Sequence, residues 1–185
     1  MEPIVAEPAV SLGDNDFVLF GVPARFAQDA AAIDARWKQL QREAHPDRFA
    51  AQGAAAQRVA LQWSVRINEA YRRLRDPLRR ASYLCELRGM PIQAESNTAM
   101  PADFLVRQMA WREALEDAST LAEVQALSAQ VAARRNDILS TLGEALDGAQ
   151  DAARAVAQVR ALMFIERFQE DIERQADTLA DAGST

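Results

Sequence analysis

The sequence predicts an all-α protein in two parts: an N-terminal antiparallel helical hairpin with short helices around it, and a C-terminal three-helix bundle. Alanine, leucine, arginine, glutamine and glutamate dominate, whereas strand-favouring runs of valine, isoleucine and threonine are scarce. Apolar residues recur at helical spacing along most of the chain. The segment 89–100 contains proline, glycine and small polar residues without such spacing, so it predicts a linker between two domains.

The N-terminal domain is expected to span residues 15–88, after a tail of residues 1–14. Acidic and amide residues at its start can cap a short helical turn that carries Phe17 and Phe20. Pro23 is tolerated in the first turn of a helix, and we expect a second short helix from this position.

Two longer helices, about 30–44 and 54–75, form the predicted hairpin. Pro46 ends the first of them because it disfavours helical backbone at the preceding residue, and a loop over 45–53 follows. The apolar stripes of the two helices are similar in length, which favours antiparallel packing. A short helix, 78–88, closed by a glycine, completes the domain. The stripes comprise Ile33, Trp37, Leu40 and Ala44 in the first helix and Val59, Trp63, Ile67, Ala70 and Leu74 in the second.

The C-terminal domain is expected to span residues 101–185. Its three helical segments, about 101–117, 120–142 and 149–181, have short connections, which is typical of a small bundle.

The first and last helices of this bundle carry more apolar residues than one buried stripe needs. In the first helix, Phe104, Trp111 and Leu115 lie on one side, and Leu105, Val106 and Met109 lie on another. In the last helix, Phe164 lies about 100° from a stripe that comprises Leu162, Ile165, Ile172 and Leu179. A three-helix bundle can hardly bury both sides, so the surplus is expected to face a partner. The alternative is that these side chains pack on the N-terminal domain or within the bundle.

Composition excludes several classes of function. The net charge of -6 opposes non-specific nucleic-acid binding, and no apolar run is long enough to span a membrane. Cys85 is the only cysteine, so we expect a buried thiol with neither an intrachain disulfide nor a thiolate metal site. The N-terminus lacks the pattern of a secretory signal, and we expect a cytoplasmic protein. With one histidine and no recognisable nucleophile–base pair, we expect neither an enzyme nor a bound cofactor.

The tripeptide His45-Pro46-Asp47 is the most informative motif. A proline-fixed turn presents an imidazole and a carboxylate with little conformational entropy left to lose on binding. It follows a basic amphipathic helix, in which Lys38 and Arg42 lie nearly opposite the apolar stripe. Basic side chains there would steer the turn toward an acidic surface.

Other interpretations of this motif remain open from the residues alone. His45 can be an ordinary exposed loop residue, and the basic helix face can be merely solvated. His45 and Asp47 can also serve as acid and base in an enzyme, which would require a substrate pocket. A nucleic-acid-binding helical protein is a further alternative, although the acidic charge opposes it.

The region from about 14 to 80 resembles the J domain. The resemblance rests on the phrase LQREAHPDRF at 40–49 and on a partner helix that contains Asn68-Glu69-Ala70-Tyr71. It implies docking on the nucleotide-binding domain of a DnaK-type chaperone, whose ATPase the J domain stimulates. The implied chaperone-binding residues are His45, Pro46, Asp47, Arg36, Lys38, Arg42 and Arg48.

The wider region from 16 to about 180 resembles the HscB family, the J-domain co-chaperones of iron–sulfur cluster assembly. The phrases that carry it are DFVLFGVPARF at 16–26, RASYL at 80–84, and FLVRQM at 104–109 followed by Arg112-Glu113. The resemblance implies delivery of the scaffold protein IscU to the chaperone HscA. The implied scaffold-binding residues are Leu105, Val106, Met109, Arg112, Glu113 and Phe164. The bundle could instead bind a different client, or serve only as a dimerisation module.

Overall fold

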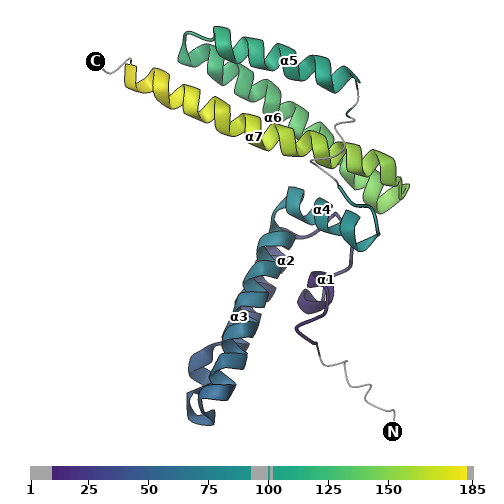
Figure 1. Ribbon diagram of the computed structural model, residues 1–185, viewed down its shortest axis with the longest axis vertical. Coiled ribbons are helices and arrows are strands. Elements are labelled where there is room, and N and C mark those ends of the chain that lie inside the picture. Colours follow the sequence, from purple (N-terminus) through teal and green to yellow (C-terminus); the bar gives the residue numbers. More distant parts are fainter. Residues whose placement is uncertain (1–9, 93–99, 101, 183–185) are drawn as a thin grey trace. The chain divides into compact units, whose positions relative to one another are not determined.

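The computed structural model describes residues 10–92, 100 and 102–182, and every regular element in this part of the chain is helical (Figure 1). This confirms the predicted all-α class. In chain order the elements are α1 (Asp16–Phe20), α2 (Ala30–Glu43), the 3-10 helix η1 (Pro46–Gln52), α3 (Ala54–Arg75), α4 (Pro77–Leu87), α5 (Ala102–Asp117), α6 (Leu121–Gly143), the π-helical turn η2 (Glu144–Gly148) and α7 (Ala152–Ala182).

The chain divides into two compact units, the first ending at Arg80 and the second beginning at Ala81. The division falls within α4, ahead of the segment that the sequence predicts as a linker. Residues 93–99 of that linker lie outside the described residues, as do residues 1–9 of the predicted tail. The predicted domain boundaries therefore stay a prediction.

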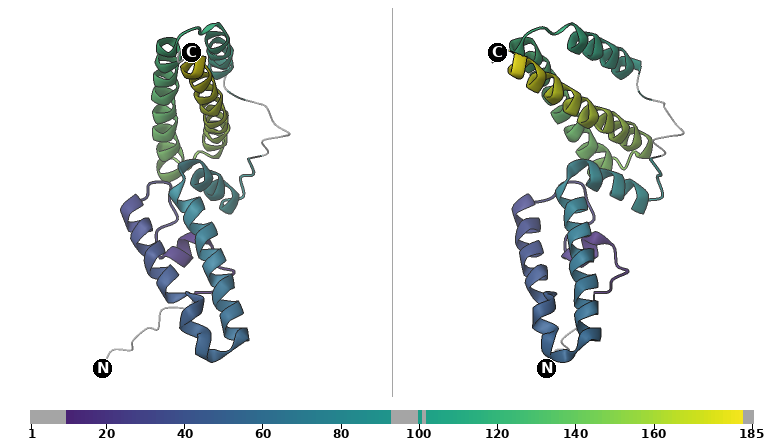
Figure 2. Two further views of the ribbon diagram at one scale, coloured as in Figure 1. Left: turned by 90° about the vertical axis from the view of Figure 1, so that its left-hand side faces the viewer. Right: turned by 60° about the vertical axis from the view of Figure 1, so that its left-hand side comes forward.

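The first unit contains the predicted antiparallel hairpin, in which α2 and α3 lie side by side (Figure 2). Its core is closed by α1, a turn capped by the Asn15 side chain, which accepts from the Val18 amide. The Asp16 carboxylate is fully buried and pairs with Arg66 and Arg73 of α3, each at 2.7 Å. Because an unpaired buried carboxylate is strongly unfavourable, these pairs fix α1 against α3. The core side chains include Phe17, Leu19, Phe20, Ile33, Leu40, Ala60, Ile67, Ala70 and Leu74.

Two predicted features of this unit are wrong. Residues 23–29, which the structure describes, form no helix after Pro23. The Gln28 amide donates to the Pro23 and Arg25 carbonyls, at 2.7 and 2.8 Å, so a side chain occupies acceptors that a helix would use. The loop predicted over 45–53 is largely the 3-10 helix η1, since Pro46 is pre-organised for a first helical turn.

A third correction concerns the stripe on α3, where Val59 is 50% exposed and Ala60 is buried instead. Val59 lies about 80° around the helix from Ile67, at the margin of the buried face.

The second unit contains the predicted three-helix bundle of α5, α6 and α7 (Figures 1 and 2). Between α5 and α6 stands a capping box: the Glu123 amide donates to the Thr120 hydroxyl, and the Glu123 carboxylate accepts from the Thr120 amide. The buried core of α6 and α7 includes Val124, Leu127, Val131, Ile138, Leu142, Val159, Leu162, Ile165, Phe168 and Ile172.

Helix α4 buries Ala81, Leu84 and Cys85. Gly89 lies two residues after its last residue, and the φ of 71° at this position lies in the left-handed region that favours glycine. The predicted buried thiol is thus confirmed, and burial raises the pKa of Cys85.

Candidate functional site

The His45-Pro46-Asp47 turn stands exposed where α2 ends. The side chains of His45 and Asp47 are 57% and 92% exposed, and Pro46 is the first residue of η1. His45 Nδ1 accepts from the Asp47 amide at 3.3 Å and lies 3.6 Å from the Asp47 carboxylate. The carboxylate itself points into solvent, so the turn can donate and accept hydrogen bonds with a second protein.

The end of α2 is fixed to α3 by side-chain hydrogen bonds. The Ser64 hydroxyl donates to the Ala44 carbonyl at 3.1 Å, immediately before His45. Nearer the start of α2, two further side chains bond to α3. The Asn68 amide oxygen accepts from Trp37 Nε1 at 2.9 Å and from the Gln41 amide at 2.8 Å. These bonds orient the turn without involving its own side chains.

A second layer of contacts lies farther along the hairpin. Trp37 stacks on Tyr71 with ring centroids 4.7 Å apart, and the Tyr71 hydroxyl donates to Asp34 at 3.0 Å. Burial, followed by this hydrogen bond, raises the pKa of Tyr71. The role of Asn68 and Tyr71 in the J-domain phrase is therefore to join the two helices.

The basic residues predicted around the turn keep their charges accessible. Lys38, Arg42 and Arg48 are exposed, whereas Arg36 is half-buried. Arg48 Nη1 donates to the Arg42 carbonyl at 3.2 Å, which holds one cation of η1 beside the last turn of α2. The arrangement suits an acidic protein surface.

An apolar cavity of about 560 Å³ lies in the same unit, between α2, η1 and α3. Arg36, Leu40, Phe49 and Trp63 are among its lining residues, and His45 and Asp47 are not. The side chains of His45 and Asp47 therefore do not face this cavity, as an acid and a base acting on a substrate bound there would.

In the second unit, α5 presents an exposed apolar face opposite its buried side. Leu105, Val106 and Met109 are 43%, 69% and 73% exposed, whereas Phe104 and Trp111 are buried. The alternative that these three side chains pack within the bundle is therefore wrong. Arg112 and Glu113 are also exposed and lie in the next turn of the helix.

Phe164 of α7 is half-buried in a cluster of four aromatic rings. We call this the ring cluster: Phe104 and Trp111 from α5, and Phe164 and Phe168 from α7. Phe164 meets Phe104 edge to face at 5.8 Å and stacks on Phe168 at 5.6 Å. Trp111 stacks on Phe168 at 6.1 Å, so two ring contacts join the helices.

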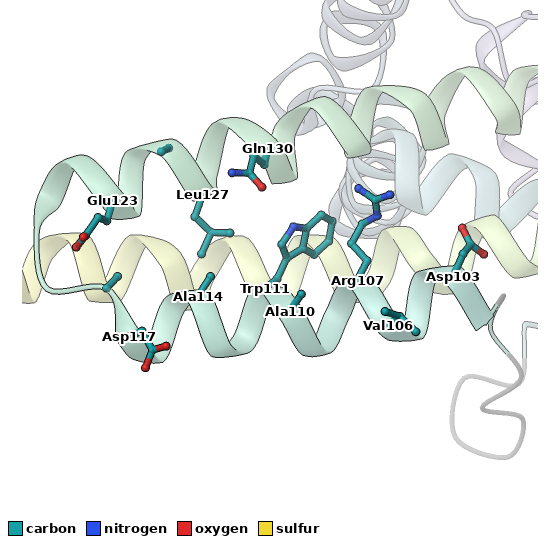
Figure 3. Close-up of a pocket in the computed structure, with 12 residues that line it drawn as sticks. Asp103, Val106, Arg107, Ala110, Trp111, Ala114, Asp117, Glu123, Leu127 and Gln130 are labelled. Atoms are coloured by element: carbon teal, nitrogen blue, oxygen red, sulfur yellow. The ribbon is translucent and has the colours of Figure 1, made fainter.

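A groove of about 620 Å³ runs between α5 and α6 (Figure 3). Figure 3 shows the indole of Trp111 between the two helices, close to Leu127, with Ala110 and Ala114 along α5. Among the predicted scaffold-binding residues only Val106 lines this groove. The exposed apolar face and the groove are thus largely separate features of α5.

The sequence pattern did not single out two of the residues that support these surfaces. These residues are Ser64 and Phe168, and each lies on the inner side of a helix. Helical periodicity places Phe168 near the core stripe of its helix, but the choice of partner ring depends on the packing of α5 on α7.

The described residues contain neither a metal-binding cluster nor a membrane-spanning helix. No cluster of three or more His, Cys, Asp or Glu side chains there could hold a metal ion. No helix in the described part is both long and apolar enough to cross a membrane.

Comparison with known proteins gives a consistent picture. A family model described as the HSCB C-terminal oligomerisation domain matches residues 100–173. A co-chaperone protein HscB homolog from Burkholderia multivorans is 52% identical over 173 residues, covering 92% of this chain and 98% of the relative. The fold is similar to that of the chaperone HscB from Vibrio cholerae, with a TM-score of 0.77 at 34% identity over 90% of this chain and 99% of that chain. It is also similar to the human co-chaperone protein HscB, with a TM-score of 0.81 at 25% identity over 92% and 84% of the two chains.

Proposed function

The chain belongs to the HscB family of co-chaperones, and we propose that it stimulates the ATPase of the DnaK-type chaperone HscA and delivers the iron–sulfur scaffold protein IscU to it. The family is non-enzymatic, and membership implies a chaperone as partner. In our proposal the ATP belongs to the chaperone and the cluster to the client. We expect delivery to occur in the cytoplasm.

The observation that carries the chaperone half of the proposal is the exposed turn at the end of a basic helix. His45 and Asp47 are free to contact another protein, while Pro46 and the Ser64–Ala44 hydrogen bond keep their backbone fixed. Lys38, Arg42 and Arg48 supply positive charge around the turn, with Arg36 at its margin. Such a surface favours a rapid, salt-sensitive encounter with an acidic lobe.

The client half rests on the exposed face of α5. A soluble bundle rarely leaves three large apolar side chains of one helix in water unless they meet a partner. We propose that IscU covers Leu105, Val106 and Met109, with Phe164 beside them and with Arg112 and Glu113 at the polar rim. Binding both partners through one chain raises their effective concentration for each other.

The decisive experiment is the steady-state ATPase of HscA with IscU, with and without the chain. We expect His45→Gln and Asp47→Asn each to reduce the stimulation more than about tenfold, since both remove groups at the centre of the proposed contact. Asp177→Asn, which removes the same charge from an exposed position of α7, should keep full stimulation. Circular dichroism would establish that all variants fold, and IscU affinity should stay unchanged. Unaltered stimulation by both variants would rule out the docking role.

A second candidate function for the bundle is self-association, favoured by the matched family model, whose description names an oligomerisation domain. It predicts that the chain sediments as a dimer and that substitutions on the α5 face convert it to a monomer. Under our proposal those substitutions weaken IscU binding and leave the sedimentation coefficient unchanged.

A further inference from the structure

The side chain of Arg112 lies over an aromatic ring, although the family resemblance assigns it to the scaffold contact. Its guanidinium carbon is 5.5 Å from the centroid of the Phe164 ring. Arg112 belongs to α5 and Phe164 to α7, so this contact crosses between helices. Among the described residues, Arg112 has no ion pair that would compete for its charge.

The position of Arg112 on α5 suits such a bridging role. By helix geometry it lies about 20° from Leu105 and about 60° from Met109, on the edge of the exposed apolar face that is nearer the buried side. From this edge the side chain reaches the α7 ring while its stem stays beside the apolar face.

Within the described part of the chain, no other cation lies above the Phe164 ring, and the ring cluster contacts this ring on further sides. Phe168 stacks on it with an interplanar angle of 13°, and Phe104 meets it at 90°. Phe164 is nevertheless only half-buried, so part of the ring is open to a partner. Removing the guanidinium would leave the exposed part of this ring less restrained, and ordering it on binding would then reduce affinity.

We propose that Arg112 is a positioning residue: it holds the Phe164 ring in place for the client instead of pairing with a charge on the client. The inference rests on the proposed function, since it concerns the same face. Arg112 then acts on the client through Phe164. The client residue opposite this edge of α5 is accordingly apolar or aromatic and not acidic.

A double-mutant cycle with the full chain tests this inference, using fluorescently labelled IscU as the probe. We expect Arg112→Met to raise the dissociation constant about threefold in the wild-type background. In a Phe164→Leu background the same change should have almost no further effect, because the ring is gone. Arg112→Lys should recover part of the loss, since an ammonium also binds an aromatic face but lacks the planar stack.

The matched control is Arg107→Met, which removes the same charge from an exposed position of α5 and should leave the affinity within about 1.5-fold. A spectroscopic readout checks the contact without any client: the side-chain protons of Arg112 should show an upfield ring-current shift in NMR spectra that Phe164→Leu removes. Raising the salt concentration should leave the effect of Arg112→Met unchanged.

Two results would overturn the inference. The first is an equal loss of IscU affinity from Arg112→Met in the wild-type and Phe164→Leu backgrounds, together with disappearance of that loss at high salt. This result would mean that Arg112 pairs directly with a charge on the client. Absence of the ring-current shift would remove the contact itself. If Leu105→Ala has no effect on IscU binding while Arg112→Met has the expected effect, the proposed face is wrong and the cation–ring contact still stands.

Discussion

The turn at His45 and the exposed face of α5 are the two protein-binding surfaces that we propose, and their chemistry is opposite. The turn offers polar and charged groups on a fixed backbone, with an Asp47 side chain that is 92% exposed. The α5 face offers apolar side chains, of which Met109 is 73% exposed. In this proposal, charge would govern the encounter at the turn, and the removal of apolar surface from water would govern binding at α5. One chain can therefore engage two partners without either one competing for the other's surface.

The two surfaces also differ in how they are supported. Side-chain hydrogen bonds across α2 and α3, such as Ser64 to the Ala44 carbonyl, fix the backbone of the turn. The α5 face is instead supported by aromatic contacts, since Phe104 and Trp111 anchor the helix on α7. Hydrogen bonds define the direction of a polar turn closely, whereas stacked rings hold a helix at a set distance and supply buried area.

The largest effect that would sharpen this contrast comes from the apolar face. Combining Leu105→Ala with Phe164→Ala should raise the dissociation constant for IscU more than about 30-fold, since two anchors that each contribute more than about 1 kcal/mol together exceed about 2 kcal/mol. Stimulation of the chaperone ATPase in the absence of IscU should be unchanged. Isothermal titration calorimetry measures the affinity for IscU, and the ATPase assay measures the stimulation of the chaperone.

A matched control for that experiment is Leu121→Ala, which shortens a leucine of α6 that is 40% exposed, close to the 43% of Leu105. It should leave IscU affinity within about twofold because the position lies outside the proposed face. If the double variant binds IscU as tightly as the wild type does, the exposed face of α5 is not the binding surface for IscU. A smaller sedimentation coefficient in the double variant would favour the dimerisation alternative.

Salt provides a test of intermediate size. Raising NaCl from about 0.05 M to about 0.5 M should raise the concentration of chain needed for half-maximal ATPase stimulation about tenfold, because it screens the charges of Lys38, Arg42 and Arg48. The affinity for IscU should change less than about twofold over the same range. Comparable sensitivity of both activities to salt would contradict the assignment of opposite chemistry to the two surfaces.

The smallest expected effect concerns the capping box between α5 and α6, a turn whose polar groups bond internally instead of facing a partner. Hydrogen bonds from the Ser119 amide, the Thr120 hydroxyl and the Thr120 amide lower the pKa of Glu123. A lowered folded-state pKa contributes stability above the ordinary value of a glutamate, and that contribution is lost as the pH falls through the lowered value. Glu123→Ala should therefore lower the melting temperature slightly, by about 2 °C, at neutral pH.

The same variant should melt at the wild-type temperature once the pH is low enough to protonate Glu123. Thermal unfolding followed by circular dichroism at pH values from about 7 down to about 2.5 measures the difference. A constant gap between the two proteins at all pH values would mean that the charge of Glu123 is not the stabilising feature.

Helical periodicity predicted the hairpin and the bundle closely, because amphipathic stripes such as Ile33 to Leu40 define both the helix and its buried side. It failed where a local side chain competed with the backbone: Gln28 bonds to carbonyls ahead of α2, and the residues after Pro23 stay non-helical. The two-sided pattern of α5 also predicted the exposed face. The contact of Arg112 with Phe164 could not be predicted, because it depends on the packing of one helix against another.

The buried thiol makes this chain well suited to site-specific fluorescence labelling. Cys85 is the only cysteine in the sequence, it is fully buried, and burial raises its pKa, so it reacts slowly with maleimides near neutral pH. Cysteines introduced on α3 and α6 would therefore carry a donor and an acceptor dye without first replacing the native residue. Energy transfer between the dyes could then follow the distance between the two units in single molecules as each partner is added.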